Sequence, residues 1–243
     1  MDTRARYSKA TLGTYYGAIP HRNTASAACR MPFPKDGYSG KRVLDVNCRK
    51  GKGALAILDR VAPGGFVMGV DPDEGLIEAA RAYALRSLGQ AAETDGRIAF
   101  ACAVPENLAE AGIEDESFDV VFANCSLNLS YDFDAVLREF ARVLAADGAF
   151  VFDAVVATGK RDYAVWAPAR VVGNEVQASY SRDGLTEALH RAGFSDVEYA
   201  DEGLIDHRVG SGASSQSAAP GVPQIDSDED VSFIRTVLTA HRR

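Results

Sequence analysis

The fold class is decided by the stretch Val43-Leu44-Asp45-Val46-Asn47-Cys48-Arg49-Lys50-Gly51, followed by Ala54-Leu55-Ala56-Ile57-Leu58. Its first four residues form a short, mostly apolar run that ends in a loop, and the second segment continues as a helix. A strand, a tight loop and a helix in this order make one unit of a parallel sheet covered by helices. Residues after such a strand lie at its carboxyl end, where ligands of this class of sheet bind.

The same alternation continues along the chain. Apolar runs predict further strands at 66–70, 98–102, 118–123 and 149–155. Helical spacing of apolar residues predicts helices that begin after Asp73 and at 133–144 and 181–192. We therefore predict an α/β fold with a Rossmann-like, doubly wound and mostly parallel sheet, completed by a terminal antiparallel hairpin of 197–201 with 204–209.

The domain organisation follows from composition. With 47% hydrophobic residues, 243 residues suffice for one substantial core. We expect an N-terminal helical cap segment over residues 1–39 and a Rossmann-like domain over residues 40–209. Residues 210–225, rich in Ser, Ala, Gly and Pro, predict a flexible linker. An acidic tail over residues 226–243, with a short helix at 231–241, would follow.

Charge and composition exclude several classes of function. The formal net charge is −8, so neither nucleic acid nor an anionic membrane is expected as the main partner. No apolar run approaches the roughly 18 residues of a membrane span, and residues 1–9 lack the apolar core of a secretory signal. We expect a cytoplasmic protein that acts on a small-molecule substrate. The four cysteines are far apart and predict no metal site.

Polar residues follow the predicted strands. Asp45, Asp71, Ala103, Asn124 and Asp153 each come at or near the end of an apolar run, so we expect them to cluster at one edge of the sheet. A carboxylate at the end of the second strand can accept hydrogen bonds from both hydroxyl groups of a ribose, which is the role we predict for Asp71. The alternative for Asp71 is a helix cap before Pro72, and the alternative for Asp153 is a strand-end residue that faces water.

One part of the sequence resembles a known family closely. The stretch Ala111-Gly112-Ile113-Glu114-Asp115-Glu116-Ser117-Phe118-Asp119-Val120-Val121, with Asn124-Cys125-Ser126-Leu127-Asn128-Leu129-Ser130, is similar to the arsenite methyltransferases almost residue for residue. The resemblance continues in 137–139 and 142–144, and in Thr14-Tyr15-Tyr16-Gly17 with Arg22 and Cys29. It covers roughly 12–197. It implies a class I methyltransferase fold and S-adenosylmethionine (SAM) as the cofactor.

The resemblance also implies a cofactor site. The family carries D-x-G-x-G-x-G where this chain has Asp45, Asn47, Arg49 and Gly51, so two loop glycines are replaced. Asn enters left-handed backbone conformations readily. The side chain of Arg49 would project into the place of the methionine part of SAM, or would form an anion site with Lys50 and Lys52 at a helix N-terminus. The alternative is that these residues are only surface charge on a loop. The remaining cofactor contacts are implied for Asp71, Ala103, Val104 and Asn124.

For the acceptor, the family implies thiolate chemistry. Cys125 and Asn124 correspond to the catalytic position, while Tyr15, Tyr16, Cys29 and Asn174 correspond to substrate contacts. The last family cysteine falls near Gly173 or Asn174, neither of which is a thiol, and the block with a second N-terminal cysteine is missing. We therefore expect a SAM-dependent methyltransferase whose acceptor is not arsenite. The alternative is a protein that keeps the fold and has lost or altered methyl transfer.

Overall fold

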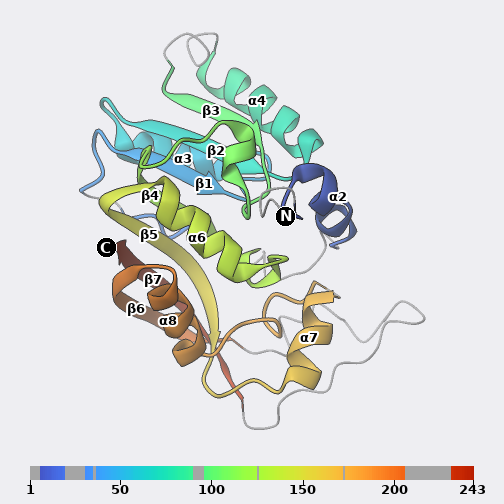
Figure 1. Cartoon of the computed structure of the whole chain (residues 1–243). Coiled ribbons are helices and arrows are strands. Elements are labelled where there is room, and N and C mark those ends of the chain that lie inside the picture. The colour runs from blue at the N-terminus through green and yellow to red at the C-terminus, as the bar shows by residue number, and fades with distance from the viewer. Residues whose placement is uncertain are drawn as a thin grey trace.

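The computed structural model of the chain describes residues 6–19, 31–34, 37–89, 96–124, 126–171, 173–205 and 231–243, and Figure 1 shows their arrangement. The strands are β1 (Arg42–Val46), β2 (Phe66–Asp71), β3 (Ile98–Cys102), β4 (Phe118–Asn124), β5 (Leu144–Ala157), β6 (Phe194–Ile205) and β7 (Phe233–Arg242). The helices are α2 (Lys9–Ala18), α3 (Lys52–Val61), α4 (Glu74–Leu88), α6 (Phe133–Val143), α7 (Tyr163–Val171) and α8 (Arg182–Arg191), with the short 3-10 helices η2 (Leu108–Ala111) and η3 (Ser126–Leu129).

The described strands form one seven-stranded sheet in the order β3-β2-β1-β4-β5-β7-β6. Strands β1 to β5 pair in parallel, whereas β7 pairs antiparallel with both β5 and β6. The strand order reverses between β1 and β4, and at such a switch point a crevice opens outside the carboxyl ends of the strands. The predicted doubly wound, mostly parallel sheet with antiparallel strands at its end is confirmed.

Several helices begin at residues whose side chains cap them. Asp73 accepts a hydrogen bond from Leu76 N at the start of α4, as predicted, and Asp132 and Ser181 cap α6 and α8 in the same way. The longest described helix, α4, has 15 residues. Among the helices that the structure describes, none is long and apolar enough to cross a membrane.

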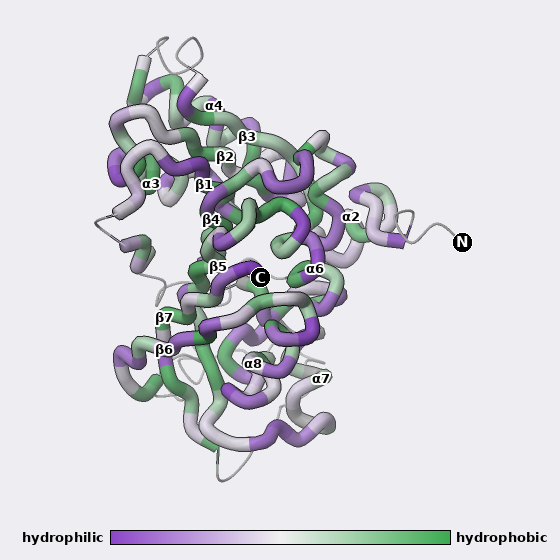
Figure 2. Tube along the Cα trace, turned by 60° about the vertical axis from the view of Figure 1, so that its left-hand side comes forward, coloured by the Kyte–Doolittle hydropathy of each residue, from purple (hydrophilic) through white to green (hydrophobic). Residues whose placement is uncertain are grey.

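The core has two layers because successive residues of each strand point to opposite faces of the sheet. Val43, Val120 and Phe122 pack with the apolar residues of α3. Leu44 and Val121 point the other way and pack with residues of α6 and α8. Figure 2 shows hydrophobic residues along β4 and β5 and hydrophilic residues spread over the outer helices. Burial on both faces explains why these strands could be recognised as nearly continuous apolar runs.

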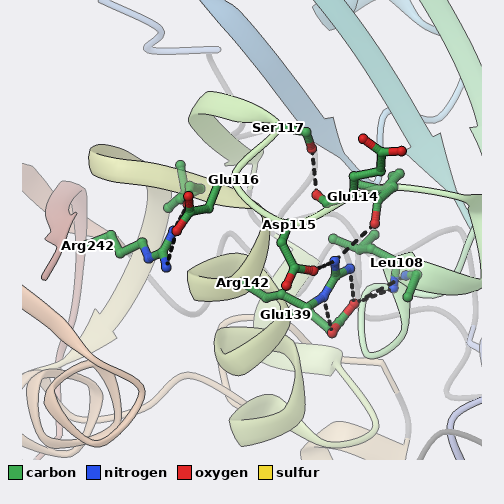
Figure 3. Close-up of polar contacts among 11 residues, drawn as sticks. Leu108, Glu114, Asp115, Glu116, Ser117, Glu139, Arg142 and Arg242 are labelled. Atoms are coloured by element: carbon green, nitrogen blue, oxygen red, sulfur yellow. Dashed lines mark hydrogen bonds and ion pairs between the residues drawn. The ribbon is translucent and has the colours of Figure 1, made fainter.

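Helix α6 fixes the segment that precedes β4 (Figure 3). The carboxylate of Glu139 accepts a hydrogen bond from the backbone N–H of Leu108 at 2.8 Å. Arg142 donates to Glu139, to the carbonyl of Ile113 at 3.0 Å and to Asp115 at 2.6 Å. The pKa of Arg142 is raised above its ordinary value, mainly by its hydrogen bond to Glu139. Two stretches that resemble the arsenite methyltransferases are thus held together by one polar cluster.

The end of the chain differs from the prediction. The short helix expected at 231–241 is wrong, because residues 233–242 form β7. Burial alternates there, with Thr236, Leu238 and Ala240 buried, which is the period of a strand. The pairing of 197–201 with 204–209 in a hairpin is also wrong. Both segments enter one strand, β6, which continues to Ile205 and pairs with β7. The predicted linker at 210–225 lies outside the described residues.

Candidate active site

The structure brings the five predicted strand-end residues to one edge of the sheet. They are Asp45, Asp71, Ala103, Asn124 and Asp153. Asp71 ends β2, and its carbonyl accepts a hydrogen bond from the N–H of Ala103 at 3.1 Å. Asn124 ends β4 and lies in register with Asp153 of β5. Asp153 is only 1% exposed and β5 continues beyond it to Ala157, so it is not a strand-end residue that faces water.

The loop after β1 keeps a left-handed backbone at all three positions where the family has glycine. The φ angles are 56° at Asn47, 51° at Arg49 and 73° at Gly51. Non-glycine residues adopt this region rarely, and Asn enters it most readily. The N–H of Arg49 donates to the Oδ2 atom of Asp71 at 3.0 Å, which ties the loop to the end of β2. A Cβ atom on Gly51 would lie 3.0 Å from the ring of Phe100, so this position also lacks room for a side chain.

Two buried carboxyl groups lie beneath this loop. Asp45 is 2% exposed and Asp71 is 5% exposed. Burial and the charge of Asp71 raise the pKa of Asp45 to about 8. Burial also raises the pKa of Asp71, although the N–H groups of Asp73 and Arg49 oppose that rise. Because Asp73 caps α4, the carboxylate of Asp71 is not needed as a cap. Two buried acids of like charge favour a ligand that brings a cation or hydrogen-bond donors.

A residue that the sequence did not indicate, Met31, reaches this edge. The Nδ2 atom of Asn124 donates to the sulfur of Met31 at 3.0 Å, while Oδ1 of Asn124 is buried and has no partner among the described residues. A Cβ atom placed on Gly53 would lie 2.9 Å from that sulfur and 3.3 Å from Oδ2 of Asp45. The thioether therefore lies between the first turn of α3, the end of β1 and the end of β4.

The segment after β3 is buried next to β2. Ala103 is 3% exposed and Val104 is fully buried. Glu106 follows two residues later and is 3% exposed, with Oε2 lacking a partner within the described ranges. Burial raises the pKa of this carboxyl group, and a hydrogen bond from Tyr16 opposes the rise.

Helix α2 brings the two predicted tyrosines over this segment. The hydroxyl of Tyr16 donates to Oε1 of Glu106 at 2.6 Å. The hydroxyl of Tyr15 donates to the carbonyl of Leu129 at 2.7 Å, and its ring meets that of Tyr131 edge-on with centroids 5.2 Å apart. Both tyrosines thus contact chain segments next to the sheet edge. In the described structure, both hydroxyl groups donate hydrogen bonds to other protein groups.

Asn174 and its neighbour Glu175 lie between α7 and α8. The Oδ1 atom of Asn174 accepts a hydrogen bond from Gln177 N at 3.0 Å and so shapes the turn that follows. The Oε2 atom of Glu175 is buried and has no partner in the part of the chain that is described. Burial raises the pKa of Glu175 to about 7, and the positive charge of Arg49 opposes that rise. The charge of Arg49, in the loop after β1, therefore acts on the carboxyl group of Glu175.

The predicted thiolates, Cys29 and Cys125, lie outside the described residues, as does Arg22. Of the described thiols, Cys48 is buried, and burial raises its pKa well above the ordinary value. Cys102 is half-buried and its pKa is raised too. Such thiols are poor nucleophiles and metal ligands. Within the described ranges, no group of three His, Cys, Asp or Glu side chains is placed to hold a metal ion.

Sequence reasoning missed Met31, Glu106 and Glu175. Glu106 had a signal, since it comes four residues after the end of β3 and so near the predicted ligand edge of the sheet. Met31 and Glu175 had none, because each comes from a segment whose approach to the sheet edge depends on tertiary packing.

The methyltransferase domain family matches residues 38–192, a segment that contains β1 to β5 and the five strand-end residues of the candidate site. The chain belongs to this methyltransferase family. The family assignment agrees with the sheet order, with the left-handed loop after β1 and with the acidic residue that ends β2.

Two relatives of this methyltransferase show how far the sequence similarity extends along the chain. The arsenite methyltransferase of Mus musculus is 34% identical over 117 residues, which cover 48% of this chain and 31% of the mouse protein. The malonyl-[acyl-carrier protein] O-methyltransferase of Geobacter sulfurreducens is 29% identical over 205 residues, which cover 77% of this chain and 72% of that protein. The match to the mouse protein thus spans about a third of its length.

A solved structure supports the same assignment. CrArsM, an arsenic(III) S-adenosylmethionine methyltransferase from Chlamydomonas reinhardtii, superposes with a TM-score of 0.69 at 26% sequence identity. The superposition covers 93% of this chain and 72% of CrArsM. The resemblance to class I SAM methyltransferases of the arsenite type is therefore confirmed.

Proposed function

We propose that this methyltransferase binds SAM at the carboxyl edge of β1, β2 and β4 and transfers its methyl group to a small-molecule acceptor other than arsenite. The observation that carries the proposal is the conformation of the loop after β1. Asn47 and Arg49 hold the left-handed backbone that the family builds with glycine. A chain that had abandoned the cofactor would have no reason to maintain this uncommon geometry at both substituted positions.

The residues at the edge fit SAM. The cofactor carries two positive groups, a sulfonium and an ammonium, and a positive group beside the buried carboxyl of Asp45 would favour its ionised form over the protonated one. Asp71 would accept hydrogen bonds from the ribose hydroxyls. The buried backbone at Ala103 and Val104 would flank the adenine, and the unpartnered Oδ1 of Asn124 would accept a hydrogen bond from the methionine part. When bound, SAM supplies an electrophilic methyl group.

The chain's own contribution to the reaction is mainly positioning. Holding two reacting groups at the right distance and angle supplies much of the rate of a transfer reaction. The tie between Arg49 N and Asp71 fixes the loop relative to β2, and the burial of Asp45 and Asp71 limits contact with water. Cys125, directly after Asn124, is our candidate for contact with the acceptor. Tyr15, Tyr16, Cys29 and Asn174 would flank the same region.

The choice of an acceptor other than arsenite follows from the thiols. Arsenic(III) is soft and is bound by converging thiolates. At most two family positions, Cys29 and Cys125, carry a thiol in this chain, and Asn174 stands at another. Asn174 is also engaged in shaping its turn. Two relatives by sequence are named as O-methyltransferases, which supports an acceptor of ordinary organic chemistry.

Calorimetric titration with SAM and with S-adenosylhomocysteine tests the proposal. We expect dissociation constants near micromolar for the unmodified chain. Asp71→Asn should weaken SAM binding about 10-fold or more, because a charge-assisted hydrogen bond contributes about 1.5–3 kcal/mol. Asp59→Asn, on the exposed side of α3, is the matched control and should bind as the unmodified chain does. The absence of heat at millimolar SAM would contradict the proposal and favour a protein that keeps only the fold.

A further inference from the structure

The backbone of Glu175 is anchored at the same sheet edge as the candidate cofactor site. Asn128 donates from Nδ2 to the carbonyl of Glu175 at 3.2 Å and to the carbonyl of Val155 at 3.4 Å. Asn128 belongs to η3, which starts two residues after Asn124, and Val155 lies two residues beyond Asp153 on β5. One side chain therefore ties Glu175 to the strands that carry two of the predicted site residues.

The side chain of Glu175 has an unused acceptor. Its Oε2 atom is buried and receives no hydrogen bond within the described ranges. A buried acceptor without a donor is rare in native proteins, because the lost hydration is not replaced. Neighbouring polar groups are already engaged, since Asn174 binds Gln177 N and Asn128 binds two carbonyls. The oxygen is available to a donor that comes from outside the described protein.

Two departures from the family influence each other electrostatically in this region. Arg49 stands at the second glycine of the loop, and Glu175 comes directly after Asn174, where the family's last thiol falls. Among the charged groups of the described residues, Arg49 is the one whose charge acts on Glu175, and it favours the ionised carboxylate against burial. No ion pair joins the two in the described structure, so Arg49 acts through space and leaves the oxygen free.

We propose that Glu175 is a catalytic residue that binds the methyl acceptor and takes its proton, and that the acceptor is a hydroxyl or amino nucleophile. This inference rests on the proposed function, since SAM supplies the methyl group. The acceptor oxygen or nitrogen forms a bond to the methyl carbon while the carbon–sulfur bond breaks. The sulfur keeps that electron pair and leaves as S-adenosylhomocysteine. The proton of the acceptor passes to Oε2 of Glu175, so charge and atoms balance.

The chemistry explains why a carboxylate would stand next to the position at which the family has a thiol. A thiolate or an arsenite bound by thiolates presents its lone pair without losing a proton, so a proton acceptor contributes little there. A hydroxyl or a protonated amine must lose a proton to become nucleophilic, and a positioned carboxylate assists that step. Arg49 is a positioning residue in this scheme, because it keeps Glu175 able to accept the proton.

The test begins with binding, which separates this inference from the proposed function. SAM and S-adenosylhomocysteine are titrated into the unmodified chain, Glu175→Gln, Glu175→Asp and the control Glu187→Gln on the exposed face of α8. We expect all four to bind SAM equally, within about twofold. If the unmodified chain does not bind SAM, the proposed function fails. If it binds and the acceptor results below disagree, only the role of Glu175 fails.

The second step follows the transfer of labelled methyl from SAM to catechol, benzyl alcohol, a primary amine, a monothiol and arsenite. We expect label on the hydroxyl or amino acceptors, with a rate reduced on the order of 100-fold in Glu175→Gln and partly restored in Glu175→Asp. Calorimetry of the best acceptor with the S-adenosylhomocysteine complex should show weaker binding to Glu175→Gln than to Glu187→Gln.

The pH dependence of the rate gives a readout that a merely structural role would not change. The unmodified chain should lose activity as pH falls and Glu175 becomes protonated, and Glu175→Gln should lack this limb. Arg49→Ala should move the limb to higher pH, because the charge that favours the carboxylate is gone. Unchanged rates and profile in Glu175→Gln, label only on the thiol or arsenite, or SAM binding without label on any of the five acceptors would each overturn the inference.

Discussion

The amide of Asn124 donates a hydrogen bond to the thioether sulfur of Met31 at 3.0 Å. The same sulfur lies beside Gly53, at the first turn of the helix that follows the cofactor loop. A side chain with the chemistry of methionine thus stands at Asn124, which we propose for the methionine part of SAM. The cofactor would have to displace Met31 from Asn124 and Gly53 when it binds.

This competition predicts that Met31→Ala binds SAM more tightly. Removing the thioether frees the amide and the space over Gly53, and the gain should be on the order of 1 kcal/mol, or about fivefold in the dissociation constant. Calorimetry measures it. Met31→Leu keeps the bulk without the sulfur and should show little gain. Weaker binding by Met31→Ala would mean that Met31 supports the cofactor.

The left-handed backbone at Arg49 predicts a difference between two substitutions. Glycine has no Cβ atom and adopts a φ of 51° without a clash, whereas alanine keeps the Cβ clash and only removes the guanidinium. Arg49→Gly should therefore be more stable than Arg49→Ala by about 1 kcal/mol. Chemical denaturation compares the two variants directly. Equal stability would show that the loop relaxes away from this geometry in solution.

The buried carboxyl of Asp45 predicts a stability that falls as pH rises. Its pKa is about 8 in the folded protein against an ordinary 3.8, so the folded state holds a proton that the unfolded chain releases between these values. This contribution is fully present below about pH 4 and is lost as pH rises through 8. Asp45→Asn should remove the loss and melt several degrees higher than the unmodified chain at pH 8, but not at pH 4.

Exposed Asp59 provides the control for this measurement, since Asp59→Asn lacks the effect of burial. A melting temperature of Asp45→Asn that follows the unmodified chain at every pH would show that Asp45 is not a buried acid.

The cluster around Arg142 predicts a large loss of stability on truncation. Arg142→Ala would remove hydrogen bonds to Glu139, Ile113 and Asp115 and leave a half-buried carboxylate without its partner. We expect a loss of about 2–3 kcal/mol in the free energy of unfolding. Arg138→Ala, exposed on the same helix, should change it by less than about 0.5 kcal/mol. Similar values for the two variants would contradict this account.

The missing thiols predict that arsenite is a poor substrate. Purified protein incubated with SAM, arsenite and a thiol reductant should form little or no methylated arsenic, as mass spectrometry would show. Methylated arsenic whose formation is abolished by Cys125→Ser would refute this expectation and return Cys125 to the family's chemistry.

Much of the sheet could be predicted from sequence for a physical reason. The central strands β1 and β4 and the second part of β5 are buried on both faces, so they leave nearly continuous apolar runs, and α6 shows a clear helical period. The positions of Asp71 and Asn124 follow, because the carboxyl ends of parallel strands all lie at the same edge of the sheet. These predictions needed the local pattern alone.

Strand β7 could not be predicted in the same way. It contains Thr236 and Thr239 among its apolar residues, so its alternation is weak, and its partners come from far away in sequence. The same limit applies to Met31 and Glu175, which enter the candidate site through tertiary packing. Local patterns indicate which residues end strands, but they do not indicate which distant segment folds over them.

The position of β7 between β5 and β6 has a consequence for synthesis in the cell. β6 cannot join the sheet until residues 233–242 have been translated and have emerged from the ribosome, because β7 is its neighbour. Until then, the edge of β5 is unpaired in the nascent chain, near Phe150 and Phe152, which are buried in the folded protein. This edge could pair with a strand of another chain or bind a chaperone. Closure of the sheet thus follows the synthesis of the other six described strands. A nascent chain that stalls a few codons before residue 233 would expose an unpaired, aggregation-prone edge of the sheet.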